Sequence, residues 1–524
     1  MRRRRSSGTR REGRGAPASR RQGRRRGGTD RALCGAGTRG DTPWPVDYRR
    51  SATAFLLAAA LAGGAARGEG VRDPVADAVS TVSPERLAAH VARLAGFGTR
   101  HALSAGSGEG RGIDAAEAWV AARFAEIPGV EVERRRVRAF RLSGGARRVA
   151  AGWPVSSPAA RFLFGLAGMG FGYREPAMSN VIARLPGREP ERLILLSAHL
   201  DSRPGKRFDW RTDAPGANDD GSGVAGLLEA ARALAPLPRR ASVWFVAFNG
   251  EELGLLGSRQ LAREIERAGL RVEAMLNLDT IGGTTTARDL PADPALPPPG
   301  TLLRVFSEGR PQHRWLDPSP RRRLAAGPSE ADSPSRQLAR YVRAAARRYV
   351  PDLQVELIAR ADRIRRGGDH FPFLRRGVAA VRFTEQREDY AHEHQDPHVE
   401  NGRRYGDLPE FVDPEYMAKV TRIAVATAAL LARAPRAPEE VRIDTSHLGE
   451  TTTVRWRPSA DPEIASYRLL ARRTASPDWE IERDAGTAGE VTVALPRDDW
   501  WFAVQAVAKD GTPSLPSLAW PSDR

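Results

Sequence analysis

The chain has 524 residues, a formal net charge of +18 and a single cysteine. This length allows a large enzyme domain followed by a smaller module, and one cysteine excludes a small disulfide-stabilised scaffold. The charge is very uneven, because residues 1–45 hold 14 arginines against 3 acidic residues and contribute +11 of the total, which leaves +7 for the rest.

Residues 1–45 are predicted to be a disordered tail, since they are rich in glycine and serine and contain almost no large apolar side chain. One interpretation is an arm that binds nucleic acid or another anionic surface. The favoured interpretation is that the tail is not translated: arginine outnumbers lysine 79 to 3, as in the product of a GC-rich coding sequence. No nucleic-acid partner is therefore expected.

Residues 46–68 have the pattern of a signal peptide. Arg49 and Arg50 precede an apolar run at 52–62, which small residues close at 63–66. The run is too short to span a bilayer, so we expect no stable membrane span. The hypothesis is a secreted or periplasmic protein that starts at Val46 or a nearby codon, and the alternative is a short anchor that is not cleaved.

The region from residue 75 onward is predicted to begin with helices. Ser83-Pro84-Glu85 is a good helix start, and residues 115–124 predict a second helix. A G-T-R-H segment lies between the two. Its Arg100 and His101 have two open interpretations, either as structural ties between the helices and a sheet or as substrate contacts.

The next stretch predicts a βαβ unit. Apolar runs at 193–196 and 243–248 have the pattern of strands buried on both faces, and the periodic segment 224–234 predicts a crossover helix. In open α/β sheets the site lies beyond the carboxyl ends of the strands. Ionisable residues stand at those places: His199, Asp201, Asp219, Glu251 and Glu252.

These residue types favour two zinc ions over one. Imidazole and carboxylate groups are zinc ligands, and one aspartate can bridge two cations through its two oxygens. Of the adjacent glutamates, one can bind metal while the other acts as a general base. A third apolar run, 274–278, ends at Asp279, and the same logic of strand ends applies there. A strand at 302–307 and helices at 335–349 and 408–432 complete the domain.

The order of these motifs resembles the M28 group of zinc aminopeptidases, over roughly residues 75 to 432. That group carries H-x-D, N-D-D-x-S-G, G-E-E, a lone aspartate and a late histidine, and all five motifs are present here. The resemblance implies a mixed, largely parallel sheet with helices on both faces. It also implies two zinc ions and the following roles: His199 and Asp279 as ligands of one zinc, Asp219 as the bridge, Glu252 as a ligand, Glu251 as the base, and Asp201 as the residue that orients His199.

The last ligand is harder to assign, because residues 389–402 contain three histidines. The family's ligand normally precedes an aspartate by four residues, and Asp396 makes that residue His392; His394 is the rival. The segment around Asp369 and His370 resembles the D-H-x-x-F element of the family, which implies that these two residues bind substrate rather than metal.

A second domain is expected at 438–524, after a proline-bearing linker. Short alternating runs separated by turn residues predict an antiparallel, immunoglobulin-like β-sandwich. The segment resembles a fibronectin type III domain, with Trp456 and Tyr467 in its core. It contains no catalytic grouping, so we expect a spacer or a module that binds a surface or a protein.

The functional hypothesis is a secreted di-zinc aminopeptidase that removes N-terminal residues from peptides. One alternative is a glutaminyl-cyclase-like acyltransferase on the same fold, which is expected to use one zinc. The other is a non-catalytic binding or adhesion protein that retains the fold. Because every ligand position and the base position are filled, the last alternative is disfavoured.

Overall fold

The structure is a computed structural model that describes residues 73–138, 177–284, 297–309, 332–447 and 449–522. The sequence predictions for the tail at 1–45 and the signal peptide at 46–68 lie outside these residues. Within the described ranges, no helix combines the length and the apolar composition that a membrane span needs.

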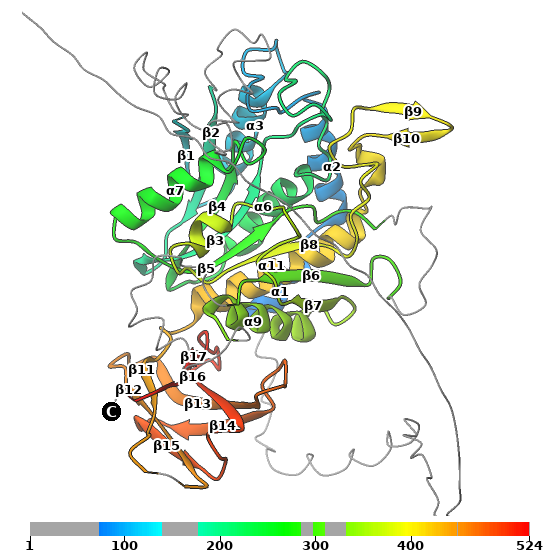
Figure 1. Cartoon of the computed structure of the whole chain (residues 1–524). Coiled ribbons are helices and arrows are strands. Elements are labelled where there is room, and N and C mark those ends of the chain that lie inside the picture. The colour runs from blue at the N-terminus through cyan, green and yellow to red at the C-terminus, as the bar shows by residue number, and fades with distance from the viewer. Residues whose placement is uncertain (1–72, 139–176, 285–296, 310–331, 448, 523–524) are drawn as a thin grey trace, which may run out of the picture. The chain divides into compact units, whose positions relative to one another are not determined.

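An eight-stranded sheet forms the centre of the larger domain (Figure 1), with the strand order β1-β2-β4-β3-β5-β8-β6-β7. The pairs β3–β4, β3–β5, β5–β8 and β6–β7 are parallel, whereas β1–β2, β2–β4 and β6–β8 are antiparallel. The strands are β1 (Glu131–Arg136), β2 (Ser179–Leu185), β3 (Glu189–His199), β4 (Ala241–Phe248), β5 (Arg271–Leu278), β6 (Leu302–Ser307), β7 (Gln354–Ile358) and β8 (Ala380–Glu385).

Five of the described helices, α1, α2, α6, α9 and α11, begin at a serine or aspartate whose side chain caps the helix. Ser83 accepts a hydrogen bond from the backbone N–H of Arg86, and Asp220 accepts one from Gly223, so both satisfy N–H groups that a helix start leaves unpaired. The helices are α1 (Pro74–Ser80), α2 (Pro84–Ala95), α3 (Ile113–Ala125), α6 (Gly221–Leu234), α7 (Leu256–Arg267), α9 (Pro334–Tyr349), α10 (Phe371–Leu374) and α11 (Pro414–Arg433), with a short 3-10 helix η1 (Pro409–Phe411).

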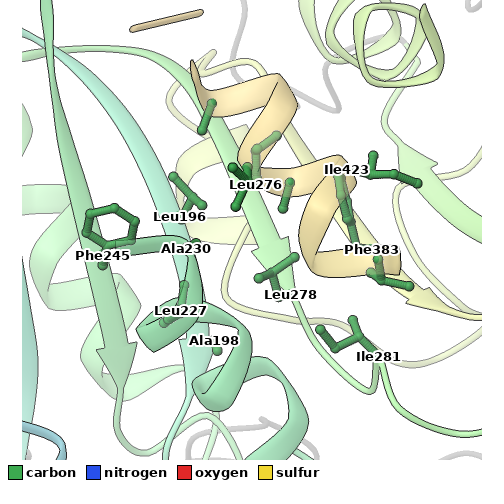
Figure 2. Packing of buried hydrophobic residues seen from close by; sticks show 14 of the residues in the cluster. Leu196, Ala198, Leu227, Ala230, Phe245, Leu276, Leu278, Ile281, Phe383 and Ile423 are labelled. Atoms are coloured by element: carbon green, nitrogen blue, oxygen red, sulfur yellow. The ribbon is translucent and has the colours of Figure 1, made fainter. Parts of the chain in front are cut away.

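Helices cover both faces of the sheet because alternate residues of its central strands point in opposite directions. Leu196 of β3 packs in one apolar cluster with Leu227 of α6 and Ile423 of α11 (Figure 2). Its neighbour Leu195 belongs to the opposite cluster, with Leu261 of α7. The predicted fold class, a mixed and largely parallel sheet between helices, is confirmed.

The segment between β8 and α11 leaves the sheet and forms a small hairpin. It contains β9 (His398–Glu400) and β10 (Arg403–Tyr405), which pair with each other in an antiparallel manner. We call residues 386–413 the hairpin segment.

The C-terminal domain is a β-sandwich of two four-stranded sheets, with the orders β15-β12-β11-β18 and β14-β13-β16-β17. Trp456 and Tyr467 pack in its core with ring centroids 5.3 Å apart. The predicted sandwich is confirmed, and its fibronectin type III identity stays a prediction. The strands are β11 (Glu439–Ile443), β12 (Thr452–Arg457), β13 (Ile464–Arg473), β14 (Ile481–Gly486), β15 (Glu490–Val493), β16 (Trp500–Ala508), β17 (Ser517–Leu518) and β18 (Trp520–Pro521).

Candidate metal centre

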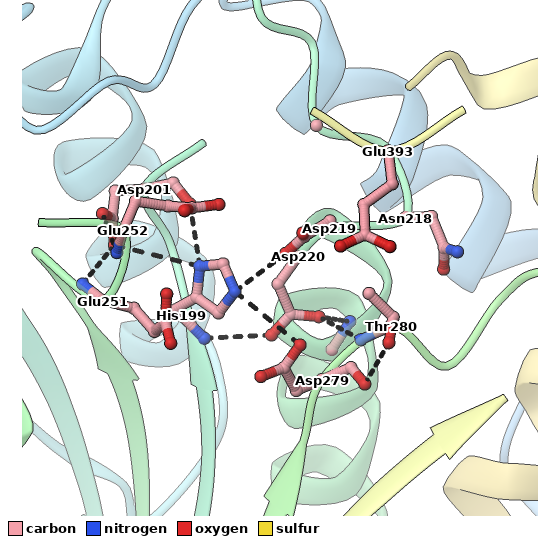
Figure 3. A network of polar contacts seen from close by, with 12 residues as sticks. His199, Asp201, Asn218, Asp219, Asp220, Glu251, Glu252, Asp279, Thr280 and Glu393 are labelled. Carbon is pink, nitrogen blue, oxygen red and sulfur yellow. Dashed lines mark hydrogen bonds and ion pairs between the residues drawn. The ribbon is translucent and has the colours of Figure 1, made fainter. Parts of the chain in front are cut away.

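Acidic and imidazole side chains gather at one edge of the large sheet (Figure 3). His199 is the last residue of β3, Glu251 and Glu252 follow β4, and Asp279 follows β5. Because β3 runs parallel to both β4 and β5, the carboxyl ends of the three strands meet at this edge. Asp219 reaches the same place from the turn before α6. The sequence prediction that these residues converge is therefore met.

Asp219 lies between two imidazole rings. Its Oδ1 is 2.9 Å from Nε2 of His199, and its Oδ2 is 2.9 Å from Nε2 of His394. Its backbone N–H donates to Asp407 Oδ2 at 2.7 Å, which fixes the turn that carries it. Burial alone would raise the pKa of the Asp219 carboxyl, but the two imidazoles hold that pKa well below its ordinary value. The carboxylate is thus placed to share its two oxygens between two neighbours.

The described residues contain two groups of potential metal ligands, and Asp219 belongs to one of them. One contains His199, Asp220 and Asp279, and the other contains Asp219, Glu252 and His394; in each group the ligand atoms lie within 4.8 Å of one another. Asp279 Oδ1 is 3.8 Å from His199 Nε2. In the second group, Glu252 Oε1 is 2.7 Å from His394 Nε2.

Asp220 differs from Asp219 because backbone groups already occupy its oxygens. Oδ2 accepts from the N–H of His199 at 3.0 Å, and Oδ1 accepts from Gly223 and Thr280 at 3.0 and 3.2 Å. Asp220 therefore caps α6 and joins three pieces of the site. Asp219, whose oxygens face the imidazoles, is the better candidate for the shared ligand.

His394, and not His392, completes the second group, which corrects the sequence prediction. His392 stacks on Phe411 with ring centroids 3.6 Å apart, and its Nδ1 lies 3.5 Å from Asp389. The predicted H-x-x-x-D spacing fails because Asp396 turns away to accept the N–H of Gly205 at 3.0 Å. The backbone at His394 adopts a φ of +53°, which turns the chain so that this ring points at Asp219 and Glu252.

The backbone of Asp201 orients His199, and its carboxylate holds the turn that carries Glu251 and Glu252. The ring N–H at Nδ1 of His199 donates to the backbone carbonyl of Asp201 at 2.8 Å, while the carboxylate lies 3.9 Å from that nitrogen. The carboxylate instead accepts the N–H groups of Gly250, Glu251 and Glu252 at 2.9, 3.1 and 3.2 Å. The predicted residue does orient His199, but its side chain positions the turn with the two glutamates.

Glu251 and Glu252 are electrostatically distinct although they are adjacent. Glu252 is 7% exposed, and Arg203 donates to its Oε2 at 2.7 Å. Burial opposes ionisation of Glu252, yet the neighbouring His394 lowers its pKa to about 2. Among the described residues, the carboxylate of Glu251 has no hydrogen-bond or ion-pair partner. Burial raises its pKa well above the ordinary value, and the nearby carboxylates raise it further.

Asp369 and His370 lie buried behind the surface of the site, and their contact with substrate stays a prediction. They are 1% and 0% exposed, and neither lines the cavity beside Glu251. The ring N–H at Nε2 of His370 donates to the carbonyl of Ala361 at 2.9 Å. His370 therefore supports the loop at 361–367. Burial also raises the pKa of the Asp369 carboxyl to about 7.

Sequence reasoning missed two arginines and one aspartate of the site. Arg382 of β8 is fully buried and donates to Asp279 Oδ1 at 2.8 Å. Arg203 contacts Nδ1 of His394 at 2.6 Å in addition to Glu252. Asp407 holds the turn of Asp219, as described above. Only Arg203, two residues after Asp201, had a local signal that could have suggested its place.

The contacts of Arg100 favour a structural role over the alternative, a contact with substrate. It is fully buried and donates to the carbonyls of Leu94, Leu200 and Gly216 at 3.1, 2.8 and 2.8 Å. These bonds connect the end of α2 to the segments that carry the site. The ring of His101 contacts the carbonyl of Arg207 at 2.9 Å.

The set of donors fits divalent metal ions. Asp219, Glu252 and Asp279 are buried carboxylates within reach of two imidazoles, and buried charges need partners of opposite sign. Arg203 and Arg382 supply only part of that compensation. Carboxylate and imidazole groups are ligand types that zinc accepts, and the Asp219 carboxylate lies beside an imidazole of each group.

The site opens into a cavity of about 360 Å³. His199, Asp219, Glu252, Asp279 and His394 all line it, together with Glu251. A small molecule or the end of a peptide could therefore reach the candidate metal ligands and the unpaired carboxylate at the same time.

Comparisons with known proteins agree with this chemistry. The model of peptidase family M28 matches residues 180–402. A probable zinc metalloprotease of Leptosphaeria maculans is 38% identical over 430 residues, which cover 82% of this chain and 93% of that protein. A probable zinc metalloprotease of Pyrenophora tritici-repentis is 37% identical over 435 residues, with coverage of 83% and 84%.

Among solved structures, the LapA aminopeptidase of Legionella pneumophila aligns with 69% of this chain and 75% of its own. The identity is 18% and the TM-score is 0.44.

Proposed function

This chain belongs to peptidase family M28 and is a zinc metallopeptidase, and from that premise we propose that it is a secreted aminopeptidase that works with two zinc ions. The observation that carries the two-ion proposal is the position of Asp219, whose two oxygens lie 2.9 Å from the imidazoles of two different ligand groups. A carboxylate in that position can serve both ions at once.

Each ion would have its own ligands besides Asp219. His199 and Asp279 would hold one ion, and Glu252 and His394 would hold the other. Zinc, when bound, lowers the pKa of a coordinated water and polarises a carbonyl group. Arg382 and Arg203 keep Asp279 and Glu252 oriented through the hydrogen bonds described above, as outer partners of metal ligands do.

Glu251 would act as the general base. It lines the cavity, its carboxylate has no partner among the described residues, and its pKa is raised by burial. A carboxylate so placed can take a proton from the attacking water and deliver it to the leaving amine. Asp201 holds the backbone of Glu251 in position through the N–H bond at 3.1 Å.

The experiment is to purify the protein without chelator, to measure zinc per chain by mass spectrometry, and to assay aminoacyl anilides. We expect about two zinc ions and hydrolysis that N-acetylation of the substrate abolishes, because an aminopeptidase requires a free amine. One zinc with cyclisation of N-terminal glutamine would support the acyltransferase alternative instead. Zinc-loaded protein that is inactive on every peptide would refute the aminopeptidase.

Export is the part of the proposal that rests on sequence alone. The apolar run at 52–62, with arginines before it and small residues after it, supports cleavage near residue 68. N-terminal sequencing of the protein from a culture supernatant or a periplasmic fraction is the test. A mature protein that begins before residue 46 would contradict both the signal peptide and the proposed start.

A further inference from the structure

The cavity beside the metal ligands is unusually basic. Six arginines contribute to its lining, against four carboxylates, and Leu255 is the one large apolar side chain among the lining residues. The arginines are Arg203, Arg207, Arg259, Arg363, Arg365 and Arg366. A pocket for leucine-like side chains would need apolar walls, which this lining does not provide.

Three of the six arginines already have acidic partners in the protein. Arg203 is paired with Glu252, as described above. Arg363 and Arg366 both contact Glu388, and Arg366 also pairs with Glu393. Their charges are therefore largely used to compensate buried carboxylates.

The other three are not compensated in this way. Arg207 donates to the backbone carbonyl of Glu252 at 2.9 Å, which leaves its charge without a carboxylate. Within the described ranges, the guanidinium groups of Arg259 and Arg365 have no hydrogen-bond or ion-pair partner. Burial lowers the pKa of Arg259, and the neighbouring Arg375 and Arg263 lower it further. An anion in the cavity would relieve that repulsion.

Arg365 stands on a loop that the rest of the protein holds in place. His370 and Arg382 both donate to carbonyls of this loop, at Ala361 and Gly367, over 2.9 and 3.2 Å. The backbone at Arg365 has a φ of +62°, a conformation that is unfavourable for residues with a Cβ atom. The loop therefore presents the guanidinium group at the cavity at a conformational cost, as binding sites often do.

We propose that the substrate carries a carboxylate next to the scissile bond, and that Arg365 and Arg259 bind it. This inference rests on the proposed aminopeptidase function and names its substrate class. A guanidinium group binds a carboxylate through two parallel hydrogen bonds, which gives both affinity and orientation. Two sources supply that chemistry: the acidic side chain of the N-terminal residue, or a carboxylate on the leaving side.

Matched pairs of substrates separate the two sources. Glutamyl anilide against glutaminyl anilide tests the N-terminal side chain, and alanyl-glutamate amide against alanyl-glutamine amide tests the leaving side. Each pair differs by one charge and hardly in shape. We expect kcat/KM to favour the acidic member of one pair by about tenfold or more, since hydrogen bonds to charged groups have that weight. Added salt should reduce this ratio.

Charge reversal at the two arginines tests the residues. Arg365→Glu and Arg259→Glu should each lower the acidic-to-neutral ratio of kcat/KM by about tenfold or more and raise relative activity on lysyl anilide. Arg267→Glu, two turns further along α7, is the control on that helix, and Arg360→Glu is the control near the loop; like the two test residues both are exposed, but they lie outside the lining and should keep the wild-type ratio. Zinc content and the thermal midpoint show that each variant is folded.

Failure of this inference can be distinguished from failure of the proposed aminopeptidase function. Peptide hydrolysis with no preference for the acidic member of either pair would overturn the inference and leave the aminopeptidase intact. A preference that survives both charge reversals would also overturn it, because the two arginines would not be the cause. Zinc-loaded protein without any peptidase activity would overturn the proposed function, and the inference with it.

Discussion

Two fully buried arginines, one in each domain, show two different uses of buried charge. Arg382 of the peptidase domain donates to Asp279, next to the ligand groups and the cavity. Arg472 of the sandwich pairs with Asp332 of the larger domain, which also accepts a hydrogen bond from Arg340 of α9 at 2.9 Å. Arg472 donates as well to the carbonyl of Ser476 at 2.6 Å. A buried ion pair by itself is thus no sign of a site. The difference lies in the neighbours, because only Arg382 adjoins acceptors that remain available for a metal ion.

The largest effect should come from Asp219→Ala. The change removes one ligand from both proposed ions and the negative charge that offsets their repulsion, so zinc falls by about one ion per chain or more and peptidase activity disappears. Metal analysis and an anilide assay measure both. Two fully occupied zinc positions in this variant would show that Asp219 is not the bridge. Asp219 would then be, like Asp332, a buried carboxylate that metal binding does not require.

The two histidines of the hairpin segment provide the next test. His394→Ala should lose one zinc ion and the activity that depends on it, by more than the 10–100-fold typical of losing an outer partner of a metal ligand. His392→Ala is the matched control two residues away, and it should keep its zinc because its ring contacts Phe411 and Asp389 instead. The opposite result would restore the assignment that the sequence predicted.

Glu251→Gln separates catalysis from metal binding. The amide keeps the shape but cannot accept a proton, so kcat should fall by about 10²–10⁴ while the zinc content stays at the wild-type level. Glu252→Gln, one residue further, should lose zinc as well. If Glu251→Gln turned over at more than about a tenth of the wild-type rate, Glu251 would not be the general base.

The smallest effect on activity is expected from Arg472→Met in the sandwich. Zinc content and kcat should not change, whereas the free energy of unfolding should fall by about 1–3 kcal/mol, because Asp332 loses one of its charged partners. The exposed neighbour Arg473→Met is the control, with an expected change within about 0.5 kcal/mol. Thermal and chemical denaturation measure the difference. Loss of zinc in Arg472→Met would mean that the sandwich supports the metal site after all.

The sequence predicted the residues that stand at the ends of apolar runs. His199, Glu251, Glu252 and Asp279 each follow a short buried strand, so one rule about the edge of a parallel sheet was enough to bring them together. The turn before α6 could be placed for a different reason: aspartate is favoured as the capping residue at the start of a helix. The assignment of the bridge to Asp219 came from the family resemblance.

Strand β8 could not be predicted, although all six of its residues are buried. Arg382, Thr384 and Glu385 interrupt its apolar pattern, and charged residues are rarely buried without a partner. The partner of Arg382 is Asp279, 103 residues earlier in the chain. Local sequence carries no signal for a contact at that separation.

The choice of His392 over His394, and the unforeseen burial of Asp369 and His370, have a related cause. Three histidines in seven residues leave the spacing ambiguous, and the backbone turn at His394 that selects the ring is a tertiary feature. The D-H motif at Asp369 indicated that the two residues lie near the site, but a motif does not say whether a side chain is buried or exposed there. The burial of both side chains depends on how the loop at 361–367 folds over them.

The two ligand groups differ in the length of chain that must fold to bring their members together. His199 ends β3 and Asp279 follows the adjacent parallel strand β5, whereas His394 reaches Glu252 from the hairpin segment, 142 residues further along. The residues around His394 lie outside the large sheet, so they can open locally while Asp407 still holds the Asp219 turn and the sheet stays folded. Occupancy of the two positions is therefore not equivalent: we expect the ion beside His394 to exchange with solution first, and the ion beside Asp279 to persist as long as the sheet does.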